Sequence, residues 1–219
     1  MDDARNSWIQ SVIVQHGDAI RSADPATQAP MRPNHAAWVR WFKDVPWVIE
    51  ALDAVGTDIS RRKLHDFVET SNIASEQGRR RAFVATLAWG VGSTNRYYGR
   101  HKQLLTSARL DDALRSSYEH LKGSRFEDSF AELNPLPGIT YRFHTKWLWV
   151  VGCELGLEPM PLTFDNRVRQ SLRRLRWPEM QRRQPQRHRW HRYVQDAGAV
   201  ARRLDVSPEH VEYWLFRGV

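Results

Sequence analysis

Apolar residues recur along most of the chain at the spacing of one helical face. Near the start, Trp8, Ile9, Val12 and Ile13 form such a stripe, which is typical of an amphipathic helix. No segment shows convincing alternation of apolar and polar residues, and no Asn-Gly pair marks a hairpin turn between strands. The pattern therefore predicts an all-α fold.

Residues that favour helix starts divide this pattern into elements. Asn and Ser cap helices and Pro suits the first turn, which predicts starts at Asn34, Pro46, Ser60, Ser75, Ser124 and Ser207. Ser124 and Glu127 have the spacing of a capping box. The helix after Pro46 should end near Gly56, and the helix after Ser75 at Gly90 or Gly92. The one segment with a flexible composition is 178–188, where Pro and Gln alternate with Arg.

The size and composition fit a globular chain. The 219 residues, 41% of them hydrophobic, can bury a core as a single domain over residues 1–219 or as two closely joined lobes. No apolar run approaches the roughly 18 residues of a membrane helix, and the acidic start is unlike a signal peptide. A lone cysteine, Cys153, excludes an internal disulfide, so we expect a cytoplasmic protein.

The charge is strongly basic and unevenly placed. The net charge is +8, and eight arginines with one acid, Glu179, lie between Arg173 and Arg192. A surplus of this kind favours a polyanionic partner. Arginine interleaved with Trp190 and Tyr193 favours nucleic acid over a membrane surface, because no apolar helical face accompanies it. A solvated loop is the structural alternative.

Two residues between Leu133 and Leu175 carry candidate chemistry. Lys146 lies in a strongly apolar helix, where desolvation would lower its pKa and leave a nucleophilic amine. Asp165 follows Pro161 and opens the next helix, and its carboxylate could stabilise a developing cation or take a proton. Each also has a purely structural interpretation. Lys146 could extend its amine to water, and Asp165 could be a helix cap and nothing more.

Three short motifs occur in a fixed order. Leu136-Pro137-Gly138, Thr145-Lys146 and the segment Pro161–Asp165 follow one another, and 19 residues separate Lys146 from Asp165. Over about residues 75–219, this arrangement resembles the helix-hairpin-helix DNA glycosylases. The resemblance is closest to the 8-oxoguanine DNA glycosylase branch, including small bacterial members linked to phage defence.

The resemblance implies an activity and a partner. A monomer without a cofactor would bind double-stranded DNA, with the two lobes flanking the cleft, and flip out a damaged or modified base. Lys146 would attack C1′ and form a Schiff base that can nick the strand, or Asp165 would activate water instead. The excised base would be 8-oxoguanine or a bulky phage-type modified cytosine, in housekeeping repair or in phage defence.

The resemblance also implies DNA-binding residues, namely Gly138, Arg142, His144, Thr145, Asn166 and Arg167. Arg142 and His144 stand near positions where the family has glycines, so Arg142 or His144 could contact the phosphate by side chain in place of bare backbone, and whether the hairpin holds a monovalent cation stays open. The glycine-rich loop 89–96 offers Gly92, Asn95 and Arg96 for the gap left in the duplex, with a simple helix end as the alternative.

The chain has ten tryptophans, and those considered for stacking on the base are Trp38, Trp41, Trp89 and Trp214. Their helical spacing also fits core positions. His188 and His191 lack a cysteine or carboxylate pair nearby in sequence, so no metal site is predicted. The competing function is a non-catalytic helical protein that binds DNA or RNA, and an enzyme acting on RNA bases is a third.

Overall fold

The computed structural model describes residues 2–94 and 97–219. In these ranges the chain forms twelve α-helices and two short 3-10 helices, and the only strand-like pairing is an isolated bridge between Met31 and Ile59. The prediction of an all-α fold is confirmed. The helices are α1 (Asp2–Arg21), η1 (Pro25–Thr27), α2 (His35–Phe42), α3 (Pro46–Val55), α4 (Arg61–Ser71), α5 (Glu76–Val91), α6 (Tyr98–Leu105), α7 (Leu110–Lys122), α8 (Phe126–Glu132), α9 (Tyr141–Glu154), α10 (Asn166–Arg174), η2 (Pro178–Met180), α11 (Gln186–Leu204) and α12 (Pro208–Arg217).

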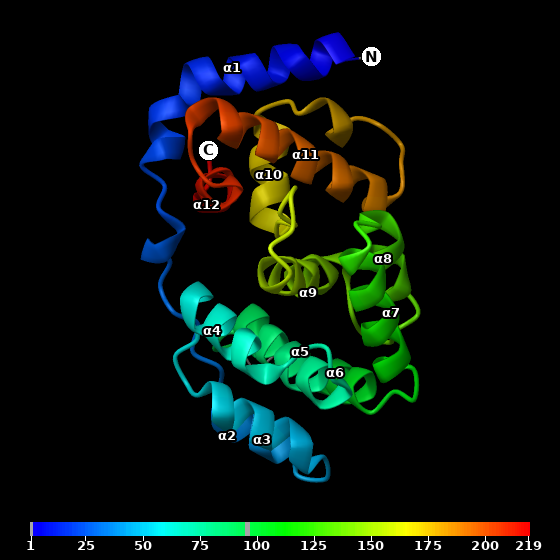
Figure 1. Cartoon of the computed structure of the whole chain (residues 1–219). Helices are drawn as coiled ribbons and strands as arrows, with labels where there is room; N and C mark the ends of the chain where they lie inside the picture. The colour runs from blue at the N-terminus through cyan, green and yellow to red at the C-terminus, as the bar shows by residue number, and fades with distance from the viewer. Residues whose placement is uncertain (1, 95–96) are drawn as a thin grey trace.

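Helix α9 lies at the centre of the molecule (Figure 1). Helices α4, α5, α7 and α8 pack against α9, and α2 and α3 extend this group through α6 and α5. The other group contains α10, α11 and α12, and α1 packs across α11 and α12. The first helix of the chain is therefore grouped with the last three.

Most predicted helix starts are confirmed. The side chains of Asn34, Ser60 and Ser75 accept backbone hydrogen bonds as the N-caps of α2, α4 and α5. Pro46 opens α3, which ends at the cap residue Gly56. The three cap side chains each accept a hydrogen bond from a backbone N–H that the helix itself leaves unpaired, and Pro46 suits the first turn because it has no N–H there.

The capping box predicted at Ser124 is wrong. Helix α8 begins at Phe126 without a side-chain cap, and Ser124 has φ 57°. Its backbone N–H donates to Leu121 O, and the Arg125 N–H donates to His120 O. Ser124 therefore closes α7 rather than opening α8. In a helix end of this kind, a residue in the left-handed conformation lets the backbone N–H groups that follow the helix bond to its last carbonyls.

The core is one cluster of buried apolar side chains drawn from both groups of helices. Eight of the ten tryptophans are buried in it, which supports the core interpretation for most of them. The segment predicted to be flexible contains η2, and Arg189 donates to Glu179 O and Arg182 O across it. No helix in the described ranges has the length and apolar character to cross a membrane.

Candidate active site

A cavity of about 300 Å³ opens where α5, α6, α9, α10 and α12 meet. Lys146 on α9 and Asp165 before α10 both line it. The two candidates from the sequence thus share one wall, although 19 residues separate them. A pocket of this size falls at the lower end of the range for small-molecule sites.

Lys146 lies in the wall of this cavity, with Nζ 4.5 Å from the centroid of the Trp89 ring. Desolvation by burial lowers the pKa of Lys146, and the charges of Asp165 and Glu212 oppose that shift. Gly90 permits the arrangement, because a Cβ there would lie 2.7 Å from Phe143 Cε1 and 3.1 Å from Lys146 Cδ. An amine whose pKa is lowered in this way has a larger neutral, nucleophilic fraction.

Asp165 is the N-cap of α10, as predicted. Its Oδ1 accepts hydrogen bonds from Arg167 N at 2.8 Å and from Val168 N at 3.1 Å. Within the described residues no hydrogen bond engages Oδ2. The carboxylate is therefore oriented through one oxygen by the helix end, while the other is available to a ligand in the cavity.

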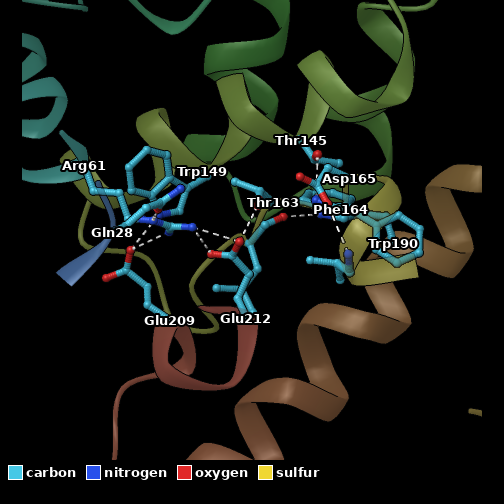
Figure 2. Close-up of polar contacts among 12 residues, drawn as sticks. Gln28, Arg61, Thr145, Trp149, Thr163, Phe164, Asp165, Trp190, Glu209 and Glu212 are labelled. Carbon is cyan, nitrogen blue, oxygen red and sulfur yellow. Dashed lines mark hydrogen bonds and ion pairs between the residues drawn. The ribbon is translucent and has the colours of Figure 1, made fainter. Parts of the chain in front are cut away.

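The segment that leads to Asp165 packs tightly against α9 and α11. A Cβ on Gly152 would lie 2.4 Å from Pro161 Cδ, so only glycine lets the proline approach α9 this closely. One residue later, Trp190 Nε1 donates to Leu162 O at 2.8 Å (Figure 2). Both contacts are buried and fix the backbone of the segment.

The next two residues are also held by hydrogen bonds (Figure 2). Thr163 Oγ1 donates to Glu212 Oε1 at 2.5 Å, and Phe164 N donates to Thr145 Oγ1 at 2.9 Å. Every residue from Pro161 to Asp165 thus has a specific packing or hydrogen-bond partner, which fixes the position of the Asp165 carboxylate relative to α9.

A second ionic centre lies beside the first. Arg61 Nη2 is 2.6 Å from Glu212 Oε2 and Arg61 Nη1 is 3.3 Å from Glu209 Oε1, while Nε donates to Gln28 at 2.5 Å (Figure 2). Arg61 also lies 5.6 Å from the centroid of Trp89, the ring that Lys146 contacts. Burial raises the pKa of Glu212, with Arg61 opposing the shift.

Sequence reasoning missed this second centre. Arg61 is the first residue of α4 and Glu212 lies between apolar residues of α12. A charge that follows an N-cap serine is ordinarily a surface residue, so the sequence carried no signal that these two would pair across the fold.

The residues predicted to bind DNA fall into three places. Gly138, Arg142, Asn166 and Arg167 line the cavity, and we retain them as candidate DNA contacts. His144 and Thr145 are instead buried beneath it, with His144 against the Phe130 ring and the Thr145 hydroxyl bound to Phe164 N.

Gly92 is the C-cap of α5 with φ 57° and does not line the cavity. Asn95 and Arg96 lie outside the described residues. Glycine is favoured at positions 92 and 138 because the backbone there has a positive φ. A Cβ on Gly138 would also come within 2.8 Å of Arg100 Cβ.

None of the four tryptophans considered for the base pocket lines the cavity. Trp38, Trp89 and Trp214 are buried, and Trp41 is 40% exposed. Helical spacing placed Trp38, Trp89 and Trp214 on core-facing sides, where large aromatic rings gain most from burial. The rings that do line the cavity come from Tyr97, Phe143 and Phe216, and Arg100 and His101 of α6 join them; the sequence analysis singled out none of these five.

Two histidines outside the cavity contact one carboxylate. Glu127 of α8 contacts His188 Nδ1, and its Oε1 lies 3.3 Å from His191 Nδ1. Across the described part of the chain, one group of three side chains is arranged so that it could share a metal ion, His65, Asp66 and Glu69 of α4, and none of them lines the cavity.

Comparison with known proteins identifies a family for most of the chain. The family model described as "Putative 8-oxoguanine DNA glycosylase OGG-like protein" matches residues 24–216. No curated protein and no solved structure matches the chain. The matched range contains every cavity residue named above and leaves out α1. The chain therefore belongs to the OGG-like family of DNA glycosylases.

Proposed function

We propose that the chain excises a damaged or modified base from DNA, with Lys146 and Asp165 as its catalytic residues. The observation that carries the proposal is their shared cavity, where one side chain is a desolvated amine and the other an oriented carboxylate. The flipped nucleotide would enter this cavity, at a cost of a few kcal/mol for unstacking. Arg142 and Arg167 line it and are available to the flanking phosphates.

In the covalent route, the neutral amine of Lys146 attacks C1′. The bond between C1′ and the base breaks, and the base leaves with that electron pair and acquires a proton. Asp165 stabilises the positive charge that develops on the sugar and accepts a proton from the attacking amine. Opening of the sugar ring then gives a Schiff base, from which elimination would nick the strand.

In the hydrolytic route, Asp165 takes a proton from water and the water oxygen bonds to C1′. The bond between C1′ and the base breaks, the base leaves with that electron pair and acquires a proton, and an intact abasic site remains. Lys146 then contributes only its charge. Asp165 is required in both routes, whereas Lys146 is a nucleophile in one. The substrate candidates are 8-oxoguanine and a cytosine with a bulky substituent, and the phage-defence role goes with the second.

Borohydride trapping separates the two routes. Duplexes carrying 8-oxoguanine, 5-hydroxymethylcytosine or its glucosylated form would be incubated with the chain and reductant. We expect base release, a covalent adduct with the wild type, and loss of that adduct in Lys146→Gln. Matched controls are Lys122→Gln and Asp128→Asn, which alter exposed side chains outside the cavity.

Base release without an adduct would support the hydrolytic route. Binding of duplex without release of any base would contradict the proposal and favour a non-catalytic DNA-binding protein. Retained base release in both Lys146→Gln and Asp165→Asn would contradict the residue assignment.

A further inference from the structure

Three residues of the cavity lining have buried polar atoms without hydrogen-bond partners. They are Nδ1 of His101, Oγ1 of Thr140 and Nε of Arg142. Buried polar atoms in native proteins are nearly always paired, so unpaired ones call for an explanation. Their occurrence in the wall that also contains Lys146 and Asp165 marks this part of the lining as incompletely paired in the free protein.

His101 is the most rigidly held of the three. It is 1% exposed, stacks against Trp38 with ring centroids 6.0 Å apart, and meets Phe143 edge-on at 5.4 Å. These contacts hold the plane of the imidazole ring. Only Nδ1 of its two ring nitrogens is fully enclosed without a partner, so the Nε2 edge is the one that can meet a ligand in the cavity that His101 lines.

The charge state of His101 follows from its surroundings. Desolvation by burial lowers the pKa of His101 to about 4, so the ring is neutral at physiological pH. A neutral imidazole carries one N–H and one bare nitrogen. An enclosed acceptor without a partner is tolerated better than an enclosed donor, which places the proton on Nε2.

The other polar side chains of the lining differ from His101. Arg100, Arg142 and Arg167 are cations on flexible side chains and suit phosphates, and Lys146 is the amine assigned to the reaction. A fixed, neutral donor suits the uncharged polar edge of a nucleobase. It favours a base with a hydrogen-bond acceptor at that position over a base with a donor or with no polar group there.

We propose that His101 reads the base in the cavity, by donating a hydrogen bond from Nε2 to a carbonyl oxygen or an unprotonated ring nitrogen of that base. This assignment rests on the proposed function, because it takes the cavity as the site that receives the flipped nucleotide. It makes His101 a specificity residue and assigns it no proton transfer.

Two substitutions separate hydrogen bonding from packing. His101→Phe keeps an aromatic ring between Trp38 and Phe143 but lacks a donor, and His101→Gln keeps an N–H donor without the ring. We expect kcat/KM for base release to fall about ten- to one-hundred-fold in His101→Phe and to recover within tenfold of wild type in His101→Gln. His120→Phe, a histidine of α7 outside the cavity, should match the wild type.

The opposite ranking of these variants, with His101→Phe active and His101→Gln inactive, would overturn the proposal and leave His101 as a packing residue. Thermal melts of each variant identify a loss that comes from unfolding. In that case the spectroscopic measurement below decides.

A spectroscopic measurement tests the contact without catalysis. Asp165→Asn protein with ¹⁵N-labelled histidine would be titrated with the same three duplexes and with a duplex that carries a tetrahydrofuran abasic site. We expect a free-state His101 with its proton on Nε2, and a change in the Nε2 shift with base-containing duplex but not with the abasic analogue.

An Nε2 shift that responds equally to the abasic duplex, or to none, overturns the proposal. The two proposals can fail separately. Absence of base release with a base-dependent Nε2 shift contradicts the proposed function alone, and base release with an unchanged Nε2 shift contradicts the role of His101 alone.

Discussion

Two ionic centres contact the ring of Trp89, and they are built on opposite principles. Around Arg61, every guanidinium nitrogen has a close partner, with Glu212, Glu209 and Gln28 all within 3.3 Å. In the cavity, Lys146 has no carboxylate within ion-pair distance among the described residues, and its Nζ rests 4.5 Å from the ring centroid.

The difference separates stability from chemistry. A buried charge that loses its partner is strongly destabilising, so the paired centre holds α4, α12 and the segment before Asp165 together. A group left without full pairing retains its reactivity, because nothing in the free protein competes with the substrate for it. The cavity accordingly contains the unpaired oxygen of Asp165 and the desolvated amine of Lys146.

The sharpest test of this contrast is Asp165→Asn. Asparagine caps helices as well as aspartate does, so the free energy of unfolding should change by less than about 0.5 kcal/mol. Base release should fall by about a thousandfold or more, because the carboxylate charge is lost from the reacting centre. Urea unfolding measures the stability, and single-turnover kinetics measure base release. A large loss of stability with full activity would show that Asp165 serves stability and not the reaction.

Glu212→Gln should produce the opposite result. It leaves Arg61 buried with a weaker set of partners, and we expect a loss of about 3–5 kcal/mol in the free energy of unfolding. At a temperature well below the melting point, base release should persist. The carboxylate of Glu212 raises the pKa of Lys146, so its loss should move the inflection of the pH–rate profile to lower pH. An unchanged inflection would show that the charge of Glu212 does not influence the pKa of Lys146.

Acid should destabilise the molecule through two buried histidines. Burial lowers the pKa of His101 to about 4 and that of His144 to about 3, from an ordinary value of 6.5. Between pH 6.5 and 4 the unfolded chain binds protons that the folded chain excludes, so stability falls as the pH falls.

Each histidine should contribute about 2–3 kcal/mol to the difference in unfolding free energy between pH 7 and pH 4.5. Urea unfolding at both pH values measures it, and His144→Phe should remove close to half. A pH dependence unaltered by both His144→Phe and His101→Phe would contradict the assignment to these two rings.

The smallest expected effect is that of Thr145→Val. The change keeps the side-chain shape but leaves Phe164 N without its acceptor, at a cost of about 1–2 kcal/mol. Because the next residue is Asp165, base release should also fall several-fold. Thr70→Val is a control, since the Thr70 hydroxyl bonds only within α4. Equal activity in the two variants would show that the bond to Phe164 does not position the carboxylate.

Local signals were sufficient for the helical fold and for the neighbouring pair of candidate residues. Asn34, Ser60, Ser75 and Asp165 could be assigned as caps because a cap acts on the two or three residues that follow it. Ser124 failed because the same residue type also ends helices.

The rest of the site depends on contacts between distant segments. Arg61 and Glu212 are 151 residues apart, and nothing in either local sequence announces a partner. His101 and Phe216 likewise reach the cavity only through the packing of α6 and α12. The four tryptophans considered for the base pocket do not line the cavity, because a ring suited to stacking on a base is equally suited to the core.

The grouping of α1 with the end of the chain has a consequence for synthesis. Trp8 Nε1 donates to Leu175 O, Arg5 pairs with Asp196, and α1 packs on α11 and α12. During synthesis α1 is translated before the helices that cover it, and more than 160 residues separate the end of α1 from the start of α11. The same late segment delivers Phe216 to the cavity. The nascent chain therefore gains its completed pocket and a cover for its first helix together, and an unfinished chain has neither.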